Sequence, residues 1–329
     1  MPVILLTDPI DPDQARWLAQ SAEIRLLGEA GVGSLAQEMT TADIVIVRRN
    51  ILAEEVRNAK RLRALVRHGV GLDFIPVETA SSEGIAVTNT PGCNDQSVAE
   101  HVFGMVLGLS RDIAFNDSEV RAGAWGALRA TAPTRRELHG SNLGLIGFGS
   151  IGKAVAEIGH FGFGMTIMAT RRSTSDGPDW VRFCSLEDVL RNADILVVAC
   201  PLTPKTDGLI SRNSLDIMRP DSILVNIARG PVIDETALAD ALRNGQIGGA
   251  CLDVFAAQPL PTASPLRSTP RTLLSPHVAG VTRDSMLRMS QTAANDSLLI
   301  LQGQQPRNLC NSAAWSTISA RWSSLSAAD

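Results

Sequence analysis

Short apolar runs recur along the chain, and each is followed by a pattern with the period of a helix. Runs of about four to eight residues rich in Val, Ile and Leu are typical of parallel strands buried on both faces. Strands that alternate with helices indicate right-handed βαβ units, so we expect an α/β fold with two doubly wound, Rossmann-like parallel sheets. The expected strands are PVILLTD, AEIRLL, ADIVIVR, LRALVRHG and GIAVTNT, followed by NLGLIGFG, MTIMAT, DILVVAC, SILVNIAR, GGACLDVF and TLLSPHV.

Two longer helical patterns, at residues 97–115 and 283–303, interrupt this rhythm. The simplest arrangement is a central dinucleotide-binding domain, residues 98–287, inserted into a second domain. That second domain would be the substrate domain, built from residues 1–97 and 288–329, and the two long helices would join the domains.

The last stretch of the chain, residues 304–329, is rich in Ser and Ala and lacks a sustained period. Chain ends of this kind are often poorly ordered unless something ties them down. We expect a surface strap or a partly disordered tail.

Composition narrows the class of protein. A length of 329 residues suits two domains, and a net charge of −4 without a basic stripe argues against a nucleic-acid partner. No apolar run approaches the roughly 18 residues of a membrane-spanning helix. The five cysteines form no CxxC and no zinc spacing, which predicts reduced thiols in a cytoplasmic protein and no metal site. The chain has no tyrosine, so a tyrosine acid is excluded.

One glycine-rich turn lies between an expected strand and an expected helix. In GFGSIG, Gly147 permits a tight turn, Gly149 lets the backbone approach a pyrophosphate, and Gly152 lets the helix pack on the strand. The backbone at Ser150 and Ile151 would begin that helix, whose N-terminus attracts the phosphate charge. The turn predicts a dinucleotide site.

The next expected strand ends in MTIMATRRS. NAD enzymes place Asp or Glu about 20 residues past the glycines, where the carboxylate binds the ribose hydroxyls. Here that place holds Arg171, and Arg172 follows. Because guanidinium groups bind a 2′-phosphate that a carboxylate would repel, we expect NADP rather than NAD.

With these features the chain resembles the D-2-hydroxyacid dehydrogenase family over residues 40–311, without the regulatory domain of some phosphoglycerate dehydrogenases. The resemblance implies an NAD(P)-dependent oxidoreductase that acts on a small 2-hydroxy or 2-oxo acid. It is specific to the family and much less specific to any one substrate. The matching stretches are HGVGLD, NTPGCNDQSVAEH, GFGSIG, PLTPKTDGLI, NIARGPVIDE, LDVF and SPHVAG.

The resemblance also assigns catalytic residues. Arg229 matches the arginine that grips the substrate carboxylate and polarises its carbonyl, a task suited to a planar guanidinium. His277 matches the general acid–base that exchanges a proton with the hydroxyl oxygen. The acid that usually accompanies this histidine is a glutamate, whereas this chain has Gln258. An uncharged partner favours the imidazolium less, so we expect reduction of an oxo acid to persist but to shift to lower pH.

Further site residues follow from the same resemblance. The backbone N–H groups around Val70 and Gly71 match donors that bind the substrate carboxylate, and Asn94 is a further candidate for substrate contact, although turn and helix-cap roles are equally open. Asp253 matches a residue that orients the nicotinamide carboxamide, whereas His101 and His160 are interpreted as structural. The remaining residues assigned to the cofactor are Cys200, Pro201, Thr206 and Ala228.

Two arginines bear on the substrate, and one segment bears on assembly. Arg48 and Arg67 end expected strands and match arginines that bind the phosphate in phosphoglycerate dehydrogenases, which predicts a second anionic group on the substrate; pairing with surface carboxylates is the alternative. Residues 118–139, with Trp125, resemble the arm that crosses to a partner subunit, so we expect a homodimer. Trp125 is equally compatible with an ordinary core position.

Two other functions remain open from sequence. Formate dehydrogenases of this family also pair Gln–Pro with the histidine, because hydride loss from formate needs no proton transfer. Corepressor members use dinucleotide binding to drive dimerisation, with turnover incidental. The intact Arg229 and His277 disfavour that scaffold role, and the stretch NTPGCNDQSVAEH disfavours the formate role.

Overall fold

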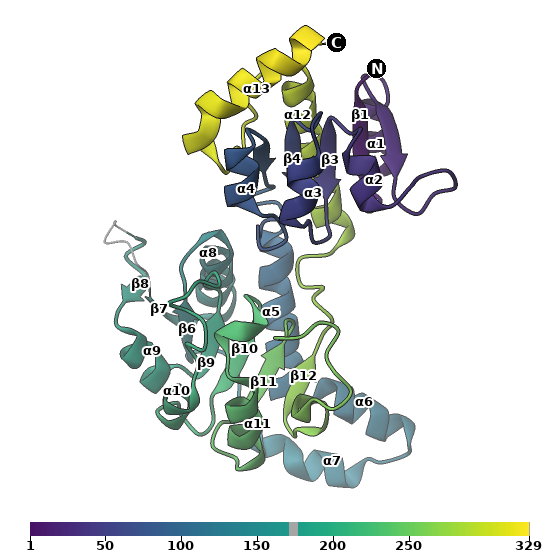
Figure 1. The fold of residues 1–329 in the computed structure, drawn as a ribbon. Coiled ribbons are helices and arrows are strands. Elements are labelled where there is room, and N and C mark those ends of the chain that lie inside the picture. The colour runs from purple at the N-terminus through teal and green to yellow at the C-terminus, as the bar shows by residue number, and fades with distance from the viewer. Residues whose placement is uncertain (171–176, 329) are drawn as a thin grey trace. The chain divides into compact units, whose positions relative to one another are not determined.

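The computed structural model describes residues 1–170 and 177–328, which form two compact units (Figure 1). Unit 1 comprises residues 1–94 and 281–329, and unit 2 comprises residues 95–280. In the part of the chain that the structure describes, no helix is long and apolar enough to cross a membrane.

The joints between the units differ from the expected positions after residues 97 and 287. The helix α5 (Asp95–Ser110) lies wholly in unit 2, and the helix α12 (Arg283–Leu301) lies wholly in unit 1. A helix is one hydrogen-bonded piece and belongs to the core that its apolar face contacts. The buried side chains of α5 belong to a core of unit 2 and those of α12 to a core of unit 1, so each joint falls just before its helix.

Unit 1 contains a five-stranded parallel sheet with the order β2-β1-β3-β4-β5. The chain starts at β1, adds β2 on one side and then adds the other strands on the opposite side, which makes the sheet doubly wound. The strands are β1 (Val3–Leu6), β2 (Glu23–Leu26), β3 (Ile44–Val47), β4 (Ala64–Arg67) and β5 (Ala86–Thr88).

Successive side chains of these strands belong to two different cores, as the period of a strand requires. On β1, Leu5 packs with the helices α2, α3 and α4, whereas Ile4 packs with α1, α12 and the C-terminal helix α13. Both residues are fully buried, which explains the continuous apolar runs in the sequence. The four N-terminal helices are α1 (Pro12–Leu18), α2 (Leu35–Met39), α3 (Ala53–Asn58) and α4 (Val77–Ser82).

Unit 2 contains a seven-stranded parallel sheet with the order β12-β11-β10-β9-β6-β7-β8. The order reverses between β6 and β9, so this sheet is also doubly wound and the expected fold class is confirmed. Its strands are β6 (Asn142–Ile146), β7 (Thr166–Thr170), β8 (Val181–Phe183), β9 (Ile195–Val198), β10 (Ile223–Asn226), β11 (Gly249–Leu252) and β12 (Thr272–Leu274).

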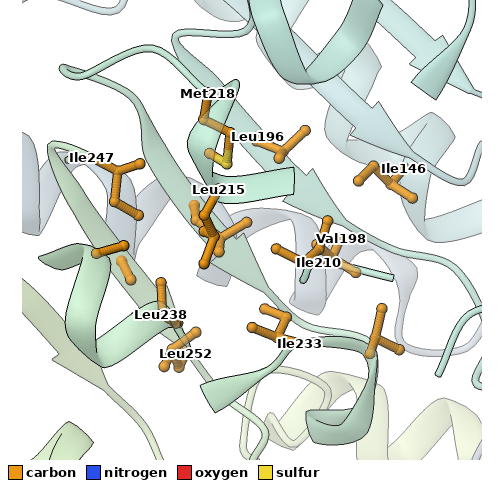
Figure 2. Packing of buried hydrophobic residues seen from close by; sticks show 14 of the residues in the cluster. Ile146, Leu196, Val198, Ile210, Leu215, Met218, Ile233, Leu238, Ile247 and Leu252 are labelled. Carbon is orange, nitrogen blue, oxygen red and sulfur yellow. The ribbon is translucent and has the colours of Figure 1, made fainter. Parts of the chain in front are cut away.

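Helices cover both faces of this sheet. One face packs against α9, α10 and α11, and Figure 2 shows side chains of that core, among them Leu196 and Val198 of β9, Leu215 of α10 and Leu238 of α11. The other face packs against α5 and α8. The helices of unit 2 after α5 are α6 (Ile113–Arg121), α7 (Gly126–Thr131), α8 (Ser150–Glu157), α9 (Leu186–Asn192), α10 (Arg212–Asp216) and α11 (Glu235–Arg243).

The C-terminal stretch is a helix, so the expectation of a strap or partly disordered tail was wrong. Helix α13 (Trp315–Ala328) buries Ile318 and Trp322, one turn apart, in the core of unit 1. The Trp322 indole donates to the Arg63 carbonyl at 3.0 Å, and the Arg321 guanidinium donates to the Leu62 carbonyl at 3.0 Å. Two apolar side chains are too few to give the sequence a helical period, but they are enough to hold the helix once they are buried in the core of unit 1.

Candidate active site

The glycine turn of unit 2 has the geometry that its sequence predicts. Gly147 has φ +99°, and a Cβ there would lie 2.9 Å from the Ala199 carbonyl oxygen. A Cβ at Gly152 would lie 2.4 Å from the Gly147 carbonyl oxygen, so helix and turn touch directly at that point. A Cβ at Gly149 would meet no atom within 4 Å, which leaves room for a ligand against the backbone.

Helix α8 begins immediately after Gly149. Within the described residues, the N–H groups of Ser150, Ile151 and Gly152 have no protein acceptor, and no side chain caps the helix. These donors and the helix dipole make a phosphate-binding position. Open space at Gly149, free amides and the missing cap together fit the pyrophosphate of a dinucleotide.

The other residues expected at the cofactor also follow strand ends at this edge of the sheet. Cys200 and Pro201 follow β9, where the Thr206 hydroxyl donates to the Pro201 carbonyl at 2.7 Å and closes the loop. Ala228 follows β10, and its N–H donates to the Asn226 amide oxygen at 3.0 Å. Arg171 and Arg172, on which the expectation of NADP depends, lie outside the described residues.

Arg229 follows β10 and is half-buried. Its Nη1 donates to the Ala228 carbonyl at 2.7 Å, which orients the guanidinium. The next residue must be glycine, because a Cβ at Gly230 would lie 1.9 Å from the carbonyl carbon of Phe255. The segment that holds Arg229 therefore packs directly against the start of the loop that holds Gln258.

His277 and Gln258 form a hydrogen-bonded pair. The His277 Nδ1 lies 2.9 Å from the Gln258 Oε1, and the Gln258 Nε2 donates to the Phe255 carbonyl at 3.3 Å. Because that second bond uses the amide nitrogen, the amide oxygen faces the ring and accepts from Nδ1–H. Nδ1 then keeps its proton in both charge states, and Nε2 is the nitrogen that gains or loses one.

A pocket of about 700 Å³ adjoins this pair, a size that suits a small organic ligand. Its walls are mainly apolar, and Arg267 contributes a charge. The Arg267 guanidinium donates to the Leu260 carbonyl at 2.6 Å and to the Pro261 carbonyl at 2.9 Å, which fixes the loop after Gln258. The pocket is lined by Phe255, Gln258, Pro259, Leu260, Arg267, Leu274, Ser275, Pro276 and His277.

Asp253 is buried at the end of β11, and its contacts are with the loop that carries His277. Its carboxylate accepts from the Ser275 hydroxyl at 2.6 Å, the Val278 N–H at 2.9 Å and the Ala279 N–H at 2.9 Å. Its carbonyl accepts from the His277 N–H at 2.8 Å. These bonds support the histidine loop; contact with a nicotinamide stays a prediction.

Unit 1 has its own cluster at the ends of β3 and β4. Arg67 donates from Nε to the Gly71 carbonyl at 3.1 Å and from Nη1 to the Val47 carbonyl at 2.9 Å. Among the described residues, the guanidinium of Arg48 has no partner, and the N–H groups of Val70 and Gly71 donate to no protein acceptor. The cluster therefore offers a cation and backbone donors to an anion.

His68 lies in the same turn and is almost fully buried. Its Nε2 lies 2.9 Å from the Ser290 hydroxyl of α12. Burial, and then the positive charges of Arg48 and Arg67, lower the pKa of His68 to about 4. This ring is therefore neutral near pH 7 and adds no charge to the cluster. Asn94, the remaining candidate, ends the first segment of unit 1.

The structure therefore brings the predicted residues together in two groups. Arg229, Gln258, His277, Asp253 and the glycine turn lie at the strand ends of unit 2, as residues after strands of one parallel sheet must. Arg48, Arg67, Val70 and Gly71 lie at the strand ends of unit 1.

Several supporting residues were missed from sequence. The Glu235 carboxylate accepts from the Ala256 N–H at 2.6 Å and steadies the segment before Gln258. Ser97 and His101 of α5, the latter interpreted only as structural, both bond to the histidine loop. The sequence contains one sign of a shared role for Ser97 and His101, which is their spacing of four residues on one helix. No motif marks this pair as functional.

Comparison with known proteins identifies the family of this chain. Residues 103–279 match the family model for the D-isomer specific 2-hydroxyacid dehydrogenase, NAD binding domain. The glyoxylate reductase of Aeropyrum pernix is 41% identical over 77% of this chain and 77% of its own length. The D-3-phosphoglycerate dehydrogenase of Mycobacterium leprae is 34% identical over 92% of this chain, which spans only 58% of that relative.

A solved structure is similar in fold. The NADPH-dependent glyoxylate/hydroxypyruvate reductase of Sinorhizobium meliloti, in complex with NADP and malonate, has a TM-score of 0.79 and 29% identity, covering 91% of this chain and 93% of that one. The chain belongs to the D-isomer specific 2-hydroxyacid dehydrogenase family. It is an oxidoreductase that uses a nicotinamide dinucleotide and interconverts a small 2-hydroxy acid and its 2-oxo acid.

Proposed function

We propose that this protein is an NADP(H)-preferring 2-hydroxyacid dehydrogenase that reduces a small 2-oxo acid best at mildly acidic pH. The observation that carries the proposal is the hydrogen bond between His277 Nδ1 and Gln258 Oε1 at 2.9 Å. A neutral amide holds the ring in the same orientation as a carboxylate would, but it adds no charge. The geometry for proton exchange is retained while the electrostatic support for the imidazolium is missing.

The residues of the chain divide the reaction among them. When bound, the nicotinamide supplies or accepts a hydride at the carbon that carries the oxygen. Arg229 binds the substrate carboxylate and polarises the carbonyl. His277 gives its Nε2 proton to the carbonyl oxygen in reduction and takes it back in oxidation. Gln258 keeps Nδ1 protonated throughout, so the proton moves only at Nε2.

The test is a pH profile of kcat/KM for reduction in the unmodified protein and in Gln258→Glu, because this quantity reports groups of the free enzyme. A carboxylate beside the ring raises the pKa of His277 by roughly 1–3 units. Reduction needs the protonated ring and fails as pH rises through that pKa, so the alkaline limb moves upward in Gln258→Glu. Gln258→Met, which removes the acceptor without adding charge, serves as control. Superimposable alkaline limbs in the native and Glu proteins overturn the proposal.

The preference for NADP(H) rests on Arg171 and Arg172 in the place where NAD enzymes carry an acid. Charge-assisted hydrogen bonds from arginine contribute about 1.5–3 kcal/mol each. We expect a higher kcat/KM with NADPH than with NADH, and Arg171→Asp reverses this order. Equal efficiencies with both cofactors in the unmodified protein contradict the preference.

We also propose that the substrate carries a second anionic or strongly polar group. The support is the cationic cluster of unit 1, where Arg48 has no partner among the described residues and Arg67 frames the turn at Val70 and Gly71. A panel of 2-oxo acids of increasing length, with and without a second carboxylate or phosphate, tests this. Glyoxylate and pyruvate turning over as fast as every longer dianion contradict it.

For the assembly, we propose a homodimer formed through the arm of α6 and α7. Several large apolar side chains are exposed there, including Phe115 at 56% and Trp125 at 65%, too much apolar surface to leave in water. The mass in solution, measured by light scattering, tests this: Phe115→Ser with Trp125→Ser becomes monomeric, and an unmodified protein that is already monomeric contradicts the dimer. We also propose a cytoplasmic location, which the free cysteines support because reduced thiols suit a reducing compartment.

A formate dehydrogenase is the second candidate, favoured by the same Gln258–His277 pair, since loss of a hydride from formate requires no proton transfer. Formate and the panel of 2-oxo acids are therefore assayed side by side. Turnover of formate alone supports this candidate. Tight dinucleotide binding without turnover of any compound supports a dinucleotide-sensing scaffold instead.

A further inference from the structure

The loop that carries His277 holds that residue in an unfavourable backbone conformation. His277 has φ +56°, in the left-handed region, which a residue with a side chain adopts only when its surroundings hold it there. Asp253 supplies part of that hold, through its carbonyl to the His277 N–H and its carboxylate to the Val278 and Ala279 N–H groups. Asp253 also accepts from the Ser275 hydroxyl, so it contacts both ends of the loop, and a second element bonded to the same ends would restrain the loop further.

Both ends of the loop are bonded to one helix. The Ser97 hydroxyl donates to the Ala279 carbonyl at 2.7 Å in a buried position. The His101 Nε2 lies 2.9 Å from the Ser275 hydroxyl oxygen. Ser97 and His101 are four residues apart on α5 and therefore lie on one face of it, so a single rigid element spans the loop from Ser275 to Ala279.

Counting protons determines the direction of the second bond. The Ser275 hydroxyl has one proton, and the buried Asp253 carboxylate, 2.6 Å away, can only accept. The Ser275 oxygen is therefore an acceptor toward His101, whose Nε2 carries a proton. The resulting chain runs from His101 to Ser275 to Asp253, and the same carboxylate anchors the amides on the far side of His277.

We infer that Ser97 and His101 are positioning residues for the reaction, which clamp the two ends of the His277 loop and so hold its Nε2 where proton exchange occurs. Neither residue is catalytic, since their bonds go to the loop and not to the reacting atoms. The inference deepens the proposed acid–base role of His277 and rests on it. A displacement of a catalytic group by about 1 Å can lower the rate on the order of 100-fold, so a modest loosening of the loop has a measurable effect.

The kinetic test compares variants that remove each donor with variants that keep it. His101→Leu and Ser97→Ala remove the donors, whereas His101→Gln and Ser97→Thr retain an N–H and an O–H. The matched control is Gln96→Ala, because Gln96 bonds to Glu100 at 2.7 Å on the same helix, also four residues apart, but at exposed positions.

We expect His101→Leu and Ser97→Ala each to lower kcat by about 10-fold, a partial misplacement of the catalytic ring. KM and the dissociation constant of NADPH stay within about threefold, because neither residue contributes to binding. The Gln and Thr variants recover most of kcat, and Gln96→Ala keeps it. Unchanged kcat in the Leu and Ala variants overturns the inference. So does a His101→Gln variant as slow as His101→Leu, since the donor is then irrelevant.

A second readout does not depend on turnover. The chain has only five histidines, so their ring Cε1–H signals can be resolved by NMR and assigned with His277→Asn. His101→Leu shifts or broadens the His277 signal, and Gln96→Ala leaves it in place. If no substrate is turned over, the proposed function fails while the clamp is still tested by this signal. A His277 signal unmoved by both His101→Leu and Ser97→Ala overturns the clamp whatever the kinetics.

Discussion

The two sheet edges of this molecule carry the same kinds of residue in opposite environments. Each has a glycine-rich turn, an arginine after a strand and a histidine. In unit 1, His68 is almost fully buried, bonds to Ser290 and has its pKa lowered to about 4. In unit 2, His277 lies beside a pocket and bonds through Nδ1 to Gln258. The residue type is the same, but one ring is buried in a core while the other lies beside a pocket.

The arginines differ in the same way. Arg229 is oriented by its own neighbour's carbonyl and backed by Gly230, which packs against Phe255. Arg67 is tied to the carbonyls of Val47 and Gly71 and stacks on Phe74 with 5.0 Å from the guanidinium carbon to the ring centre. Arg229 is thus the cation of the proposed chemistry in unit 2, while Arg67 shapes the turn at the strand ends of unit 1. Four experiments, with five substitutions, test the differences between these two sheet edges.

The largest effect is expected from Arg229→Gln. This change removes a planar cation that makes charge-assisted hydrogen bonds worth about 1.5–3 kcal/mol each, so kcat/KM falls about 1000-fold for every 2-oxo acid. Steady-state kinetics measure it. Arg243→Gln, an exposed arginine of α11 in the same unit, is the control and leaves kcat/KM unchanged. A loss of under tenfold in Arg229→Gln would mean that the substrate carboxylate is bound elsewhere.

The next effect concerns stability and the buried histidine. The folded pKa of His68, about 4, lies below its unfolded value near 6.5, so the unfolded chain binds more protons between these pH values. Stability is full above pH 6.5 and falls as pH drops to 4, by roughly 3 kcal/mol from this residue alone. In His68→Gln this part of the decrease in the free energy of unfolding at low pH disappears. Urea unfolding at pH 7 and 4.5 measures it.

The control for that experiment is His139→Gln, an exposed histidine of unit 2. The free energy of unfolding of His139→Gln should decrease between pH 7 and pH 4.5 by the same amount as that of the unmodified protein. If the free energy of unfolding depends on pH in the same way in His68→Gln and in the unmodified protein, the pKa of the buried ring is not lowered. That outcome would contradict the difference between His68 and His277.

The third experiment compares two glycines of the same turn. Gly152 is expected to matter for packing, and Gly149 for contact with the dinucleotide. In Gly152→Ala the new Cβ would lie 2.4 Å from the Gly147 carbonyl oxygen, so helix or turn must shift, at about 1–3 kcal/mol. In Gly149→Ala the Cβ meets no atom within 4 Å, so the loss of stability stays below about 1 kcal/mol while NADPH binding weakens. Thermal unfolding and fluorescence titration with NADPH measure the two quantities. Unweakened NADPH binding in Gly149→Ala would contradict a pyrophosphate at this turn.

The smallest effect is expected from Arg48→Gln and is selective. Losing one charge-assisted contact lowers kcat/KM about 10-fold or more for a 2-oxo acid with a second anionic group, and leaves glyoxylate within about threefold. Arg49→Gln is the neighbouring control, because Arg49 is already paired with Asp8 at 3.0 Å. If kcat/KM falls equally for glyoxylate and for the dianion, Arg48 stabilises the turn and does not bind the second anionic group.

Much of the fold followed from local pattern, and the exceptions have clear causes. The expected strands all formed, and most of them are buried on both faces, which requires continuous apolar runs. Strand β8 was missed, since it has three residues of which only Val181 is buried. Helix α13 was missed because its hold on the core depends on Ile318 and Trp322 reaching a sheet that is formed by the other end of the chain.

The sequence by itself determined the two parallel sheets and the glycine turn, and it marked Arg229 and His277 as the candidates for the proposed chemistry. These depend on the period of apolar residues and on chemistry within a few neighbouring positions. Only the tertiary structure decided which nitrogen of His277 bonds to Gln258, how deeply His68 is buried, and how His101 reaches Ser275 across 174 positions of chain. Such properties depend on burial and on contacts between residues that are distant in the chain, and local sequence patterns predict neither.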